Sequence, residues 1–173
     1  MRANGLTEHG HVYAARLVWD GNTGSGTAGY TTYEREYSVT VEGKPVLHGS
    51  ADPVFRGAPD RHNPEEHFLI AIAACHMLAY QALCARQGVR VLGYEDSVTG
   101  TLTLNRNGGG RFSDVLLSPE VTIADDADAD LARRLHDTAH ERCFIANSCS
   151  IPIRHDASIR RAGAQSRPMP VTG

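Results

Sequence analysis

The chain has 173 residues, and its 17 Lys and Arg nearly balance its 20 Asp and Glu, which gives a formal net charge of −3 with nine neutral His. This length suits one domain with a hydrophobic core of its own, and we expect residues 1–173 to fold as a single domain. The lack of a basic surplus argues against a nucleic-acid partner, and no block of like charges marks an interaction tail.

Cysteine usage bears on the compartment. Residues 1–5 lack the apolar core of a signal peptide, which favours a cytoplasmic protein whose thiols stay reduced. The four cysteines are Cys75, Cys84, Cys143 and Cys149. They are too few for a secreted disulfide framework, and none forms a Cys-x-x-Cys pair of the zinc-ribbon kind. Each is therefore a core residue or a reactive thiol.

The first predicted elements are strands. Residues 11–19 are expected to form one, and residues 30–41 a clearer one, because apolar and polar side chains alternate there. The alternation puts Arg35 on the apolar, inward face of its strand. A turn at residues 42–44 leads into a hairpin return at residues 45–48.

Signals at both ends predict a long helix. Asn63 can cap it, Pro64 suits its first position, and Glu66 completes a capping box. The helix should run to Gln87, with Gly88 as its C-terminal stop.

The same helix is unusually apolar. Residues 68–75 are apolar on every side, which predicts burial all round. A membrane span over residues 68–85 is the competing interpretation, but His76 and Gln81 interrupt it, and a span requires about 20 apolar residues. We therefore expect no membrane partner.

A hairpin and a second helix follow. Residues 98–104 and 112–123 are expected to pair across a glycine-rich turn, and aspartates in residues 125–128 to open the helix at its positive end. The expected core-side stripe of this helix is Leu131, Leu135, Thr138, Ala139 and Arg142, with Cys143 at its edge.

The chain is expected to close with a strand through residues 151–153, and residues 160–173 to fray. The order of strands, long helix, strands, helix and strand predicts an α+β fold with mostly antiparallel sheet.

Cys75, halfway along the apolar helix, could be an ordinary small core residue. Burial raises the pKa of such a thiol, and the helix N-terminus is too distant to lower it, so reactivity requires a nearby cation. Arg35 and Arg56 are the candidates. A buried arginine needs a carboxylate partner, and Glu65 and Glu66 are the nearest.

Distance constrains this cluster. Glu65 and Cys75 are separated by ~15 Å along a straight helix. Joining them through one arginine requires a bent helix, a long bridging side chain or a residue from a second chain. The apolar helix also requires more cover than one layer of a small domain gives. Both points favour a homodimer with its sites at the interface.

A metal site is a rival hypothesis. His136, His140 and Cys143 share one helix face at i, i+4 and i+7, and with His76 they could bind zinc. Histidines on a helix flank are more often not ligands, so we expect neither a metal nor a cofactor.

Five segments resemble the OsmC/Ohr family of proteins. They are residues 63–66 (Asn-Pro-Glu-Glu), 73–78 (Ala-Ala-Cys-His-Met-Leu), 94–96 (Tyr-Glu-Asp) followed by Gly100, 139–148 around Cys143, and 50–57 before the long helix. The two cysteine segments at this separation are the most specific part of the resemblance.

The resemblance implies an OsmC-like fold, with antiparallel sheets around a long buried central helix, in an intertwined homodimer. It implies Cys75 as the thiolate that attacks peroxide, Cys143 as the resolving thiol, and Glu65 as the carboxylate that holds an arginine. Arg56 matches the position used in OsmC proper, whereas Arg35 lies nearer the position used in Ohr, and both stay candidates.

The sequence also departs from the family pattern. Phe144 follows the second cysteine where OsmC and Ohr have proline, and Arg61 and His62 stand where they have Gly-Thr. This indicates a less typical OsmC-like branch, in which Cys149 could compete as resolving thiol and Cys84 is a core residue.

The expected function is a thiol-dependent peroxidase in oxidative-stress defence. Its expected substrates are organic hydroperoxides, with hydrogen peroxide as a further candidate, and its reductant is a dithiol, lipoyl or other. The alternative is an OsmC-like ligand-binding or metal-binding protein without peroxidase turnover.

Overall fold

The computed structural model describes residues 10–163. The chain divides into two compact units between Glu66 and His67. The expectation of a single domain stays a prediction. The predicted lack of a signal peptide in residues 1–5, and most of the predicted frayed tail, lie outside the described residues.

The N-terminal unit contains a small antiparallel sheet in the order β1-β2-β3. Its elements are β1 (Arg16–Trp19), β2 (Tyr37–Thr40), β3 (Leu47–Gly49) and the 3-10 helix η1 (Pro53–Phe55). The predicted hairpin between β2 and β3 is confirmed, but both early strands are shorter than predicted.

Local hydrogen bonding explains the shortening of the strand predicted over residues 30–41. The Asn22 side chain accepts from the backbone N–H groups of Gly24 and Gly26, and the Thr32 hydroxyl bonds with Gly29. Such side chains compete with a strand ladder for backbone partners. Residues 21–36 therefore form turns, and β2 begins only at Tyr37.

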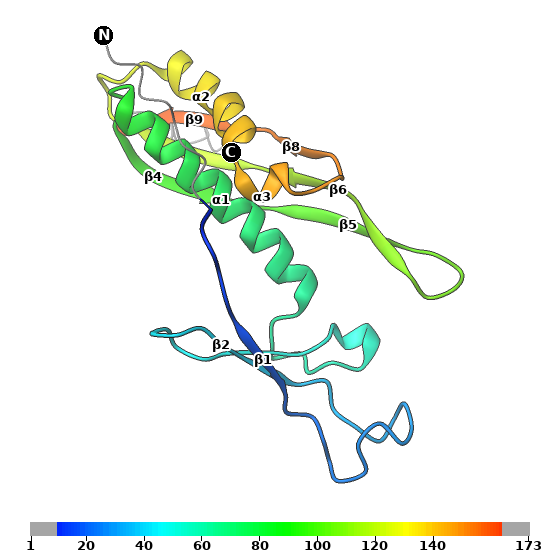
Figure 1. The fold of residues 1–173 in the computed structure, drawn as a ribbon. Helices are drawn as coiled ribbons and strands as arrows, with labels where there is room; N and C mark the ends of the chain where they lie inside the picture. The colour runs from blue at the N-terminus through cyan, green and yellow to red at the C-terminus, as the bar shows by residue number, and fades with distance from the viewer. Residues whose placement is uncertain (1–9, 164–173) are drawn as a thin grey trace, which may run out of the picture. The chain divides into compact units, whose positions relative to one another are not determined.

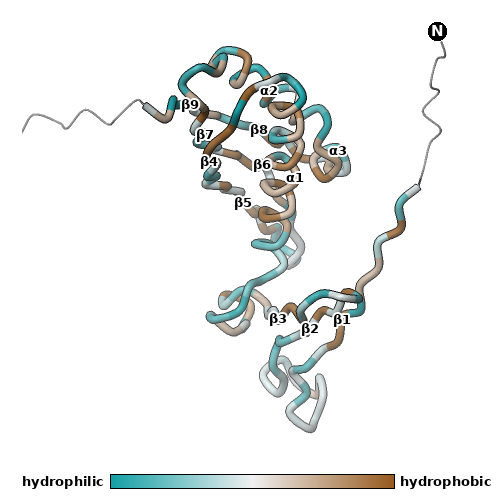
Figure 2. The backbone as a smooth tube through the Cα atoms, turned by 90° about the vertical axis from the view of Figure 1, so that its left-hand side faces the viewer, coloured by the Kyte–Doolittle hydropathy of each residue, from teal (hydrophilic) through white to brown (hydrophobic). Residues whose placement is uncertain are grey.

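The second unit is an α+β sandwich of helices over strands, so the predicted fold class is confirmed. Its elements are α1 (Pro64–Arg86, whose first turn precedes the division), β4 (Val91–Asp96), β5 (Thr99–Leu104), β6 (Gly110–Leu117), β7 (Pro119–Ile123), α2 (Ala129–Arg142), α3 (Phe144–Asn147), β8 (Ile153–His155) and β9 (Ser158–Arg161). Figures 1 and 2 show the three helices on one side of the strands of this unit.

The strands of this unit form two sheets, in the orders β4-β7-β9 and β5-β6-β8. Two pairings are antiparallel, as predicted, and β8 and β9 add to them in parallel. The single strand predicted over residues 112–123 is two strands. They separate at Ser118, whose backbone N–H donates to the Asp96 carboxylate at 2.8 Å. The chain can therefore pass from one sheet to the other.

The ends of α1 follow the local signals. Asn63 accepts from the Glu66 N–H at 2.8 Å, and the Glu66 carboxylate accepts from the Asn63 N–H at 3.3 Å, which is the predicted capping box. At the other end Gly88 has a φ of 75°, where the missing side chain avoids strain. The helix ends at Arg86, one residue before the prediction.

Only one side of α1 is buried within the chain. Ile72, His76 and Tyr80 are fully buried at helical spacing, whereas Ile70 is 50% and Leu78 61% exposed. The prediction that the first half is buried all round is therefore wrong for a single chain, because the strands cover only one side. Among the described residues, α1 is the helix long and apolar enough to cross a membrane by length and composition, a criterion that core helices also meet.

The second helix begins as predicted but buries a different stripe. Asp128 caps it by accepting from the N–H groups of Asp130 and Leu131, both at 2.9 Å. Its buried residues are Ala132, Leu135, His136 and Ala139. Arg142, predicted on the core side, is exposed. The buried stripe is rotated relative to the predicted one, because His136 turns inward to pair with the buried His76 of α1.

The first residues of the predicted frayed tail are part of a sheet. Arg160 and Arg161 belong to β9, which pairs with β7. The following Ala162 N–H donates to the Ile123 carbonyl at 2.9 Å, and this extends the register.

Candidate functional site

The two predicted reactive thiols lie together. Cys75 projects from α1, and Cys143 lies where α2 ends and α3 begins. The Cys75 thiol lies close enough to affect the charge of the Cys143 thiol, and all four cysteines are free. Cys143 is fully buried. Burial, together with the nearby Cys75 thiol, raises the pKa of Cys143 to about 11. Cys143 thus keeps its proton at neutral pH.

An apolar pocket of about 560 Å³ opens beside Cys75. Its lining is Cys75, Leu78, Ala79, Ala82, Leu83, Arg86, Glu141, Arg142, Phe144 and Asn147. The six residues from α1 repeat every three or four positions, so they share one face of that helix. The thiol of Cys75 therefore meets a mostly hydrocarbon surface that also carries two arginines and one carboxylate.

The remaining predicted site residues belong to the N-terminal unit. Arg35 is half-buried, and its guanidinium donates to the carbonyls of Tyr30 and Tyr33 and lies 4.7 and 4.1 Å from their ring centroids. Carbonyl groups and aromatic rings of this unit therefore contact the Arg35 guanidinium. Arg56 has an exposed side chain and ends η1 with a φ of 70°.

Glu65 lies near Tyr37 within the same unit. Burial, helped by the Glu65 carboxylate, raises the pKa of Tyr37. Among residues 10–163 no ion pair joins Glu65 to Arg35 or Arg56. The role of an arginine held by Glu65 beside Cys75 stays a prediction.

Cys149 and Cys84 have other surroundings. The Cys149 thiol donates to the Ile145 carbonyl at 3.1 Å, one turn back along the chain. Cys84 is 1% exposed, and burial raises its pKa, which suits the predicted core role. Of the three other thiols, Cys143 is the one that interacts with Cys75.

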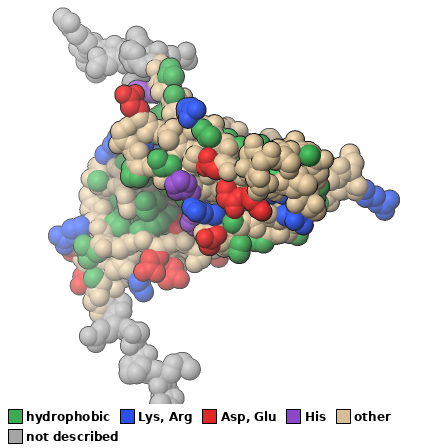
Figure 3. Space-filling view, turned by 90° about the horizontal axis from the view of Figure 1, so that it is seen from below, with side chains coloured by type: hydrophobic (Ala, Val, Ile, Leu, Met, Phe, Trp, Pro, Cys, Tyr) green, Lys and Arg blue, Asp and Glu red, His purple; other side chains and the backbone are tan. Residues whose placement is uncertain are grey.

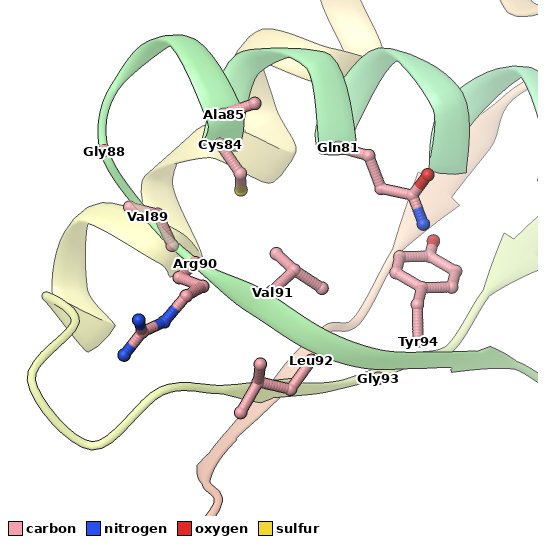
Figure 4. A pocket seen from close by; sticks show the side chains of 10 residues that line it. All are labelled: Gln81, Cys84, Ala85, Gly88, Val89, Arg90, Val91, Leu92, Gly93 and Tyr94. Atoms are coloured by element: carbon pink, nitrogen blue, oxygen red, sulfur yellow. The ribbon is translucent and has the colours of Figure 1, made fainter.

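A second pocket, of about 650 Å³, lies between the C-terminal half of α1 and β4 (Figure 4). Cys84, Val91 and Tyr94 point into it, whereas Arg90 and Leu92 point away. Because its only sulfur is a buried, protonated thiol, this larger hollow is a poor candidate for thiol chemistry.

Four histidines gather between α1, α2 and β8, and only part of this cluster was predicted. His76 and His136 are fully buried, and their ring nitrogens Nε2 and Nδ1 are 3.0 Å apart. The His155 ring lies 5.6 and 5.9 Å from these two, and the His140 ring 5.7 Å from His155. No periodic signal in the sequence points to His155, because it ends a three-residue strand.

Burial governs the charge of this cluster. It lowers the pKa of His76 to about 4 and that of His136 to about 3, and it lowers the pKa of His155. The buried rings are therefore neutral at neutral pH. Within residues 10–163 no three His, Cys, Asp or Glu side chains form a group that could hold a metal ion. The zinc hypothesis grouped His136, His140 and Cys143 with His76, and of these four the structure joins His76 and His136 by a direct hydrogen bond.

Acidic and basic side chains both appear on the face seen in Figure 3.

Comparisons with solved structures identify the fold. An OsmC-like protein of unknown function from Vibrio cholerae has a TM-score of 0.76 and 27% identity, over 86% of this chain and 99% of that one. An organic hydroperoxide resistance protein from Elizabethkingia anophelis has a TM-score of 0.65 and 16% identity, over 90% and 99%. An organic hydroperoxide resistance protein OsmC from Legionella pneumophila has a TM-score of 0.63 and 18% identity, over 88% and 98%.

Comparisons of the sequence itself identify a family. A search of curated proteins finds no match. The family model described as OsmC-like protein matches residues 57–157, which is more than half of the chain and includes both paired thiols. The chain therefore belongs to the OsmC-like protein family.

Proposed function

We propose that this protein is a thiol-dependent peroxidase that reduces organic hydroperoxides. The observation that carries the proposal is the interaction of the Cys75 thiol with the Cys143 thiol beside an apolar pocket. The names of the Elizabethkingia anophelis and Legionella pneumophila structures, both organic hydroperoxide resistance proteins, support the same chemistry.

In the first step, the Cys75 thiolate attacks the outer oxygen of the hydroperoxide. An S–O bond forms, the O–O bond breaks, and the alkoxide takes up a proton and leaves as an alcohol. Cys75 is then a sulfenic acid. The hydrocarbon lining of the pocket favours the organic part of such a substrate.

In the second step, the Cys143 sulfur attacks the sulfenic sulfur. The S–S bond forms, the S–O bond breaks, and the Cys143 proton leaves with the hydroxyl group as water. A dithiol reductant then restores both thiols by exchange. The raised pKa of Cys143 suits this order, because a protonated Cys143 leaves the first attack to Cys75.

The proposal also includes a cation and a second copy of the chain. Arg56 or Arg35, held by Glu65, would favour the thiolate of Cys75. The exposed apolar surface beside the pocket supports a homodimer, because such patches often mark protein interfaces. It includes Leu78 of α1, which is 61% exposed, and Phe144 of α3, which is 81% exposed. We further propose a cytoplasmic location.

The test is consumption of cumene hydroperoxide by the reduced protein with dithiothreitol as reductant. Cys75→Ser should abolish turnover, whereas Cys84→Ser, which removes a core thiol, should keep it. Without dithiothreitol, Cys143→Ser should stop at a sulfenic Cys75 after one equivalent of peroxide and at an over-oxidised Cys75 after further equivalents, which mass spectrometry detects. Unchanged turnover in Cys75→Ser would refute the proposal, and binding of the peroxide without turnover would favour a ligand-binding protein.

A further inference from the structure

We infer that His76 and His136 are positioning residues, whose mutual hydrogen bond holds the Cys75 and Cys143 thiols opposite each other. His76 directly follows Cys75 on α1, and His136 precedes Cys143 by seven residues, about two turns of α2. The bond therefore joins the two helices that carry the two thiols. The inference rests on the proposed pairing of Cys75 with Cys143.

The geometry of the bond is well defined. Nε2 of His76 and Nδ1 of His136 are 3.0 Å apart, and the ring planes differ by 13°. The Tyr80 ring lies on the His136 ring, with centroids 3.8 Å apart and planes differing by 14°. α1 therefore contacts the His136 ring twice: Tyr80 stacks on its face, and His76 bonds to a nitrogen at its edge.

The bond resists separation of the helices. Both rings are fully buried, and within residues 10–163 their outer nitrogens, Nδ1 of His76 and Nε2 of His136, have no hydrogen-bond partner. Separating the rings would leave two more buried nitrogens unsatisfied, which is costly in a protein interior. The other buried residues of α2 are Leu135 and the small Ala132 and Ala139, so the histidine bond is the buried polar contact of this helix face.

This placement affects a measurable redox quantity. Two thiols form a disulfide more readily when the folded chain holds them at bonding distance, and this appears as a lower reduction potential. Loss of the histidine bond should let α2 shift against α1 and make the disulfide easier to reduce. His76 and His136 need not touch the substrate for this effect.

The test measures the Cys75–Cys143 disulfide at equilibrium with mixtures of reduced and oxidised dithiothreitol, so it requires no peroxide. His136→Phe keeps a ring to stack on Tyr80 but removes the nitrogens. We expect its disulfide equilibrium constant to fall about tenfold or more. His136→Asn carries a polar atom at the position of Nδ1 and should stay within about threefold of the wild type.

Two further variants separate positioning from general stability. His136→Gln is also polar, but its amide reaches the position of Nε2, so it should behave like His136→Phe and serves if that variant does not fold. Val121→Ala truncates a fully buried residue of β7 outside the histidine pair and should leave the equilibrium constant unchanged while lowering stability.

The outcomes separate the inference from the proposed function. Equal constants for wild type, His136→Phe and His136→Gln would overturn the inference, as would an equal fall in Val121→Ala. A wild type that forms no Cys75–Cys143 disulfide would also overturn it. If the histidine variants behave as expected but the wild type consumes no cumene hydroperoxide, the inference stands and the peroxidase proposal fails.

Discussion

Acid should destabilise this protein through its buried histidine pair. In the unfolded chain a histidine binds a proton near its ordinary pKa of 6.5, whereas burial lowers the folded-state pKa to about 4 for His76 and about 3 for His136. Between these values the unfolded state binds more protons, so stability falls as the pH falls. The stability that the neutral rings contribute is complete above about pH 6.5 and is lost progressively as the pH falls toward about 4.

The size of the effect follows from the same values. At about pH 4.5 an unfolded histidine is almost fully protonated and a folded one with a pKa of about 4 is mostly neutral, which lowers the free energy of unfolding by about 2.5 kcal/mol per ring. The two rings share a hydrogen bond and face His155 and His140, so their contributions are not simply additive. Asp96 acts in the opposite direction, because burial raises its pKa and it gains a proton more readily when folded.

Urea unfolding at about pH 7 and about pH 4.5 measures the loss, with the double variant His76→Gln, His136→Asn as the comparison. Both proteins share Asp96, Asp137, Asp156 and every other titrating group, so the difference between them isolates the pair. We expect the wild type to lose at least about 2.5 kcal/mol more than the double variant. Equal losses in the two proteins would refute the assignment of buried, neutral rings.

Three further predictions concern other parts of the molecule. Asn63→Ala should lower the free energy of unfolding by about 1 kcal/mol in urea titrations, because it removes the cap of α1, and an unchanged midpoint would contradict the capping role. Leu78→Asp puts a charge on the exposed apolar side of α1 and should turn a dimer into a monomer in sedimentation at micromolar concentration, whereas a monomeric wild type would contradict the proposed homodimer. Cys149→Ser should leave the Cys75–Cys143 disulfide intact in mass-spectrometric mapping after one equivalent of peroxide, and a Cys75–Cys149 bridge in the wild type would show that Cys143 is the wrong partner.

The sequence predicts best those elements whose signals are local. The capping box at Asn63 and the glycine stop at Gly88 lie within a few residues of the helix ends that they define, and α1 was predicted to within one residue. The strand over residues 30–41 was predicted too long because its alternation continues through residues whose backbone partners are turn side chains. β8 pairs in parallel with β6, and β9 pairs in parallel with β7. The residues within β8 and β9 give no signal for these pairings, because the partner strands lie far away in the sequence.

The candidate site was predicted in the same uneven way. Cys75 and Cys143 were both identified from their segments, and the structure joins them. His76 and His136 were brought together only in the zinc hypothesis. Their direct hydrogen bond was not predicted, because they are 60 residues apart and the bond depends on how α2 packs on α1. The arginine could not be chosen, since Arg35 and Arg56 differ only in their tertiary surroundings.

Cys143 also serves as the cap of two consecutive helices. It ends α2, and its sulfur accepts from the Ala146 N–H at 3.5 Å at the start of α3. Sulfur is a weaker acceptor than the oxygens that usually cap helices, and α3 has only four residues, so this single turn has little stability of its own. We expect a disulfide at Cys143 to reorient that acceptor, because the S–S bond imposes its own geometry on the sulfur. Hydrogen exchange of the Ala146 amide should therefore change when the thiols are oxidised. Because α3 contains Phe144, which lines the pocket, oxidation of Cys143 would also change the surface that a bound molecule contacts there.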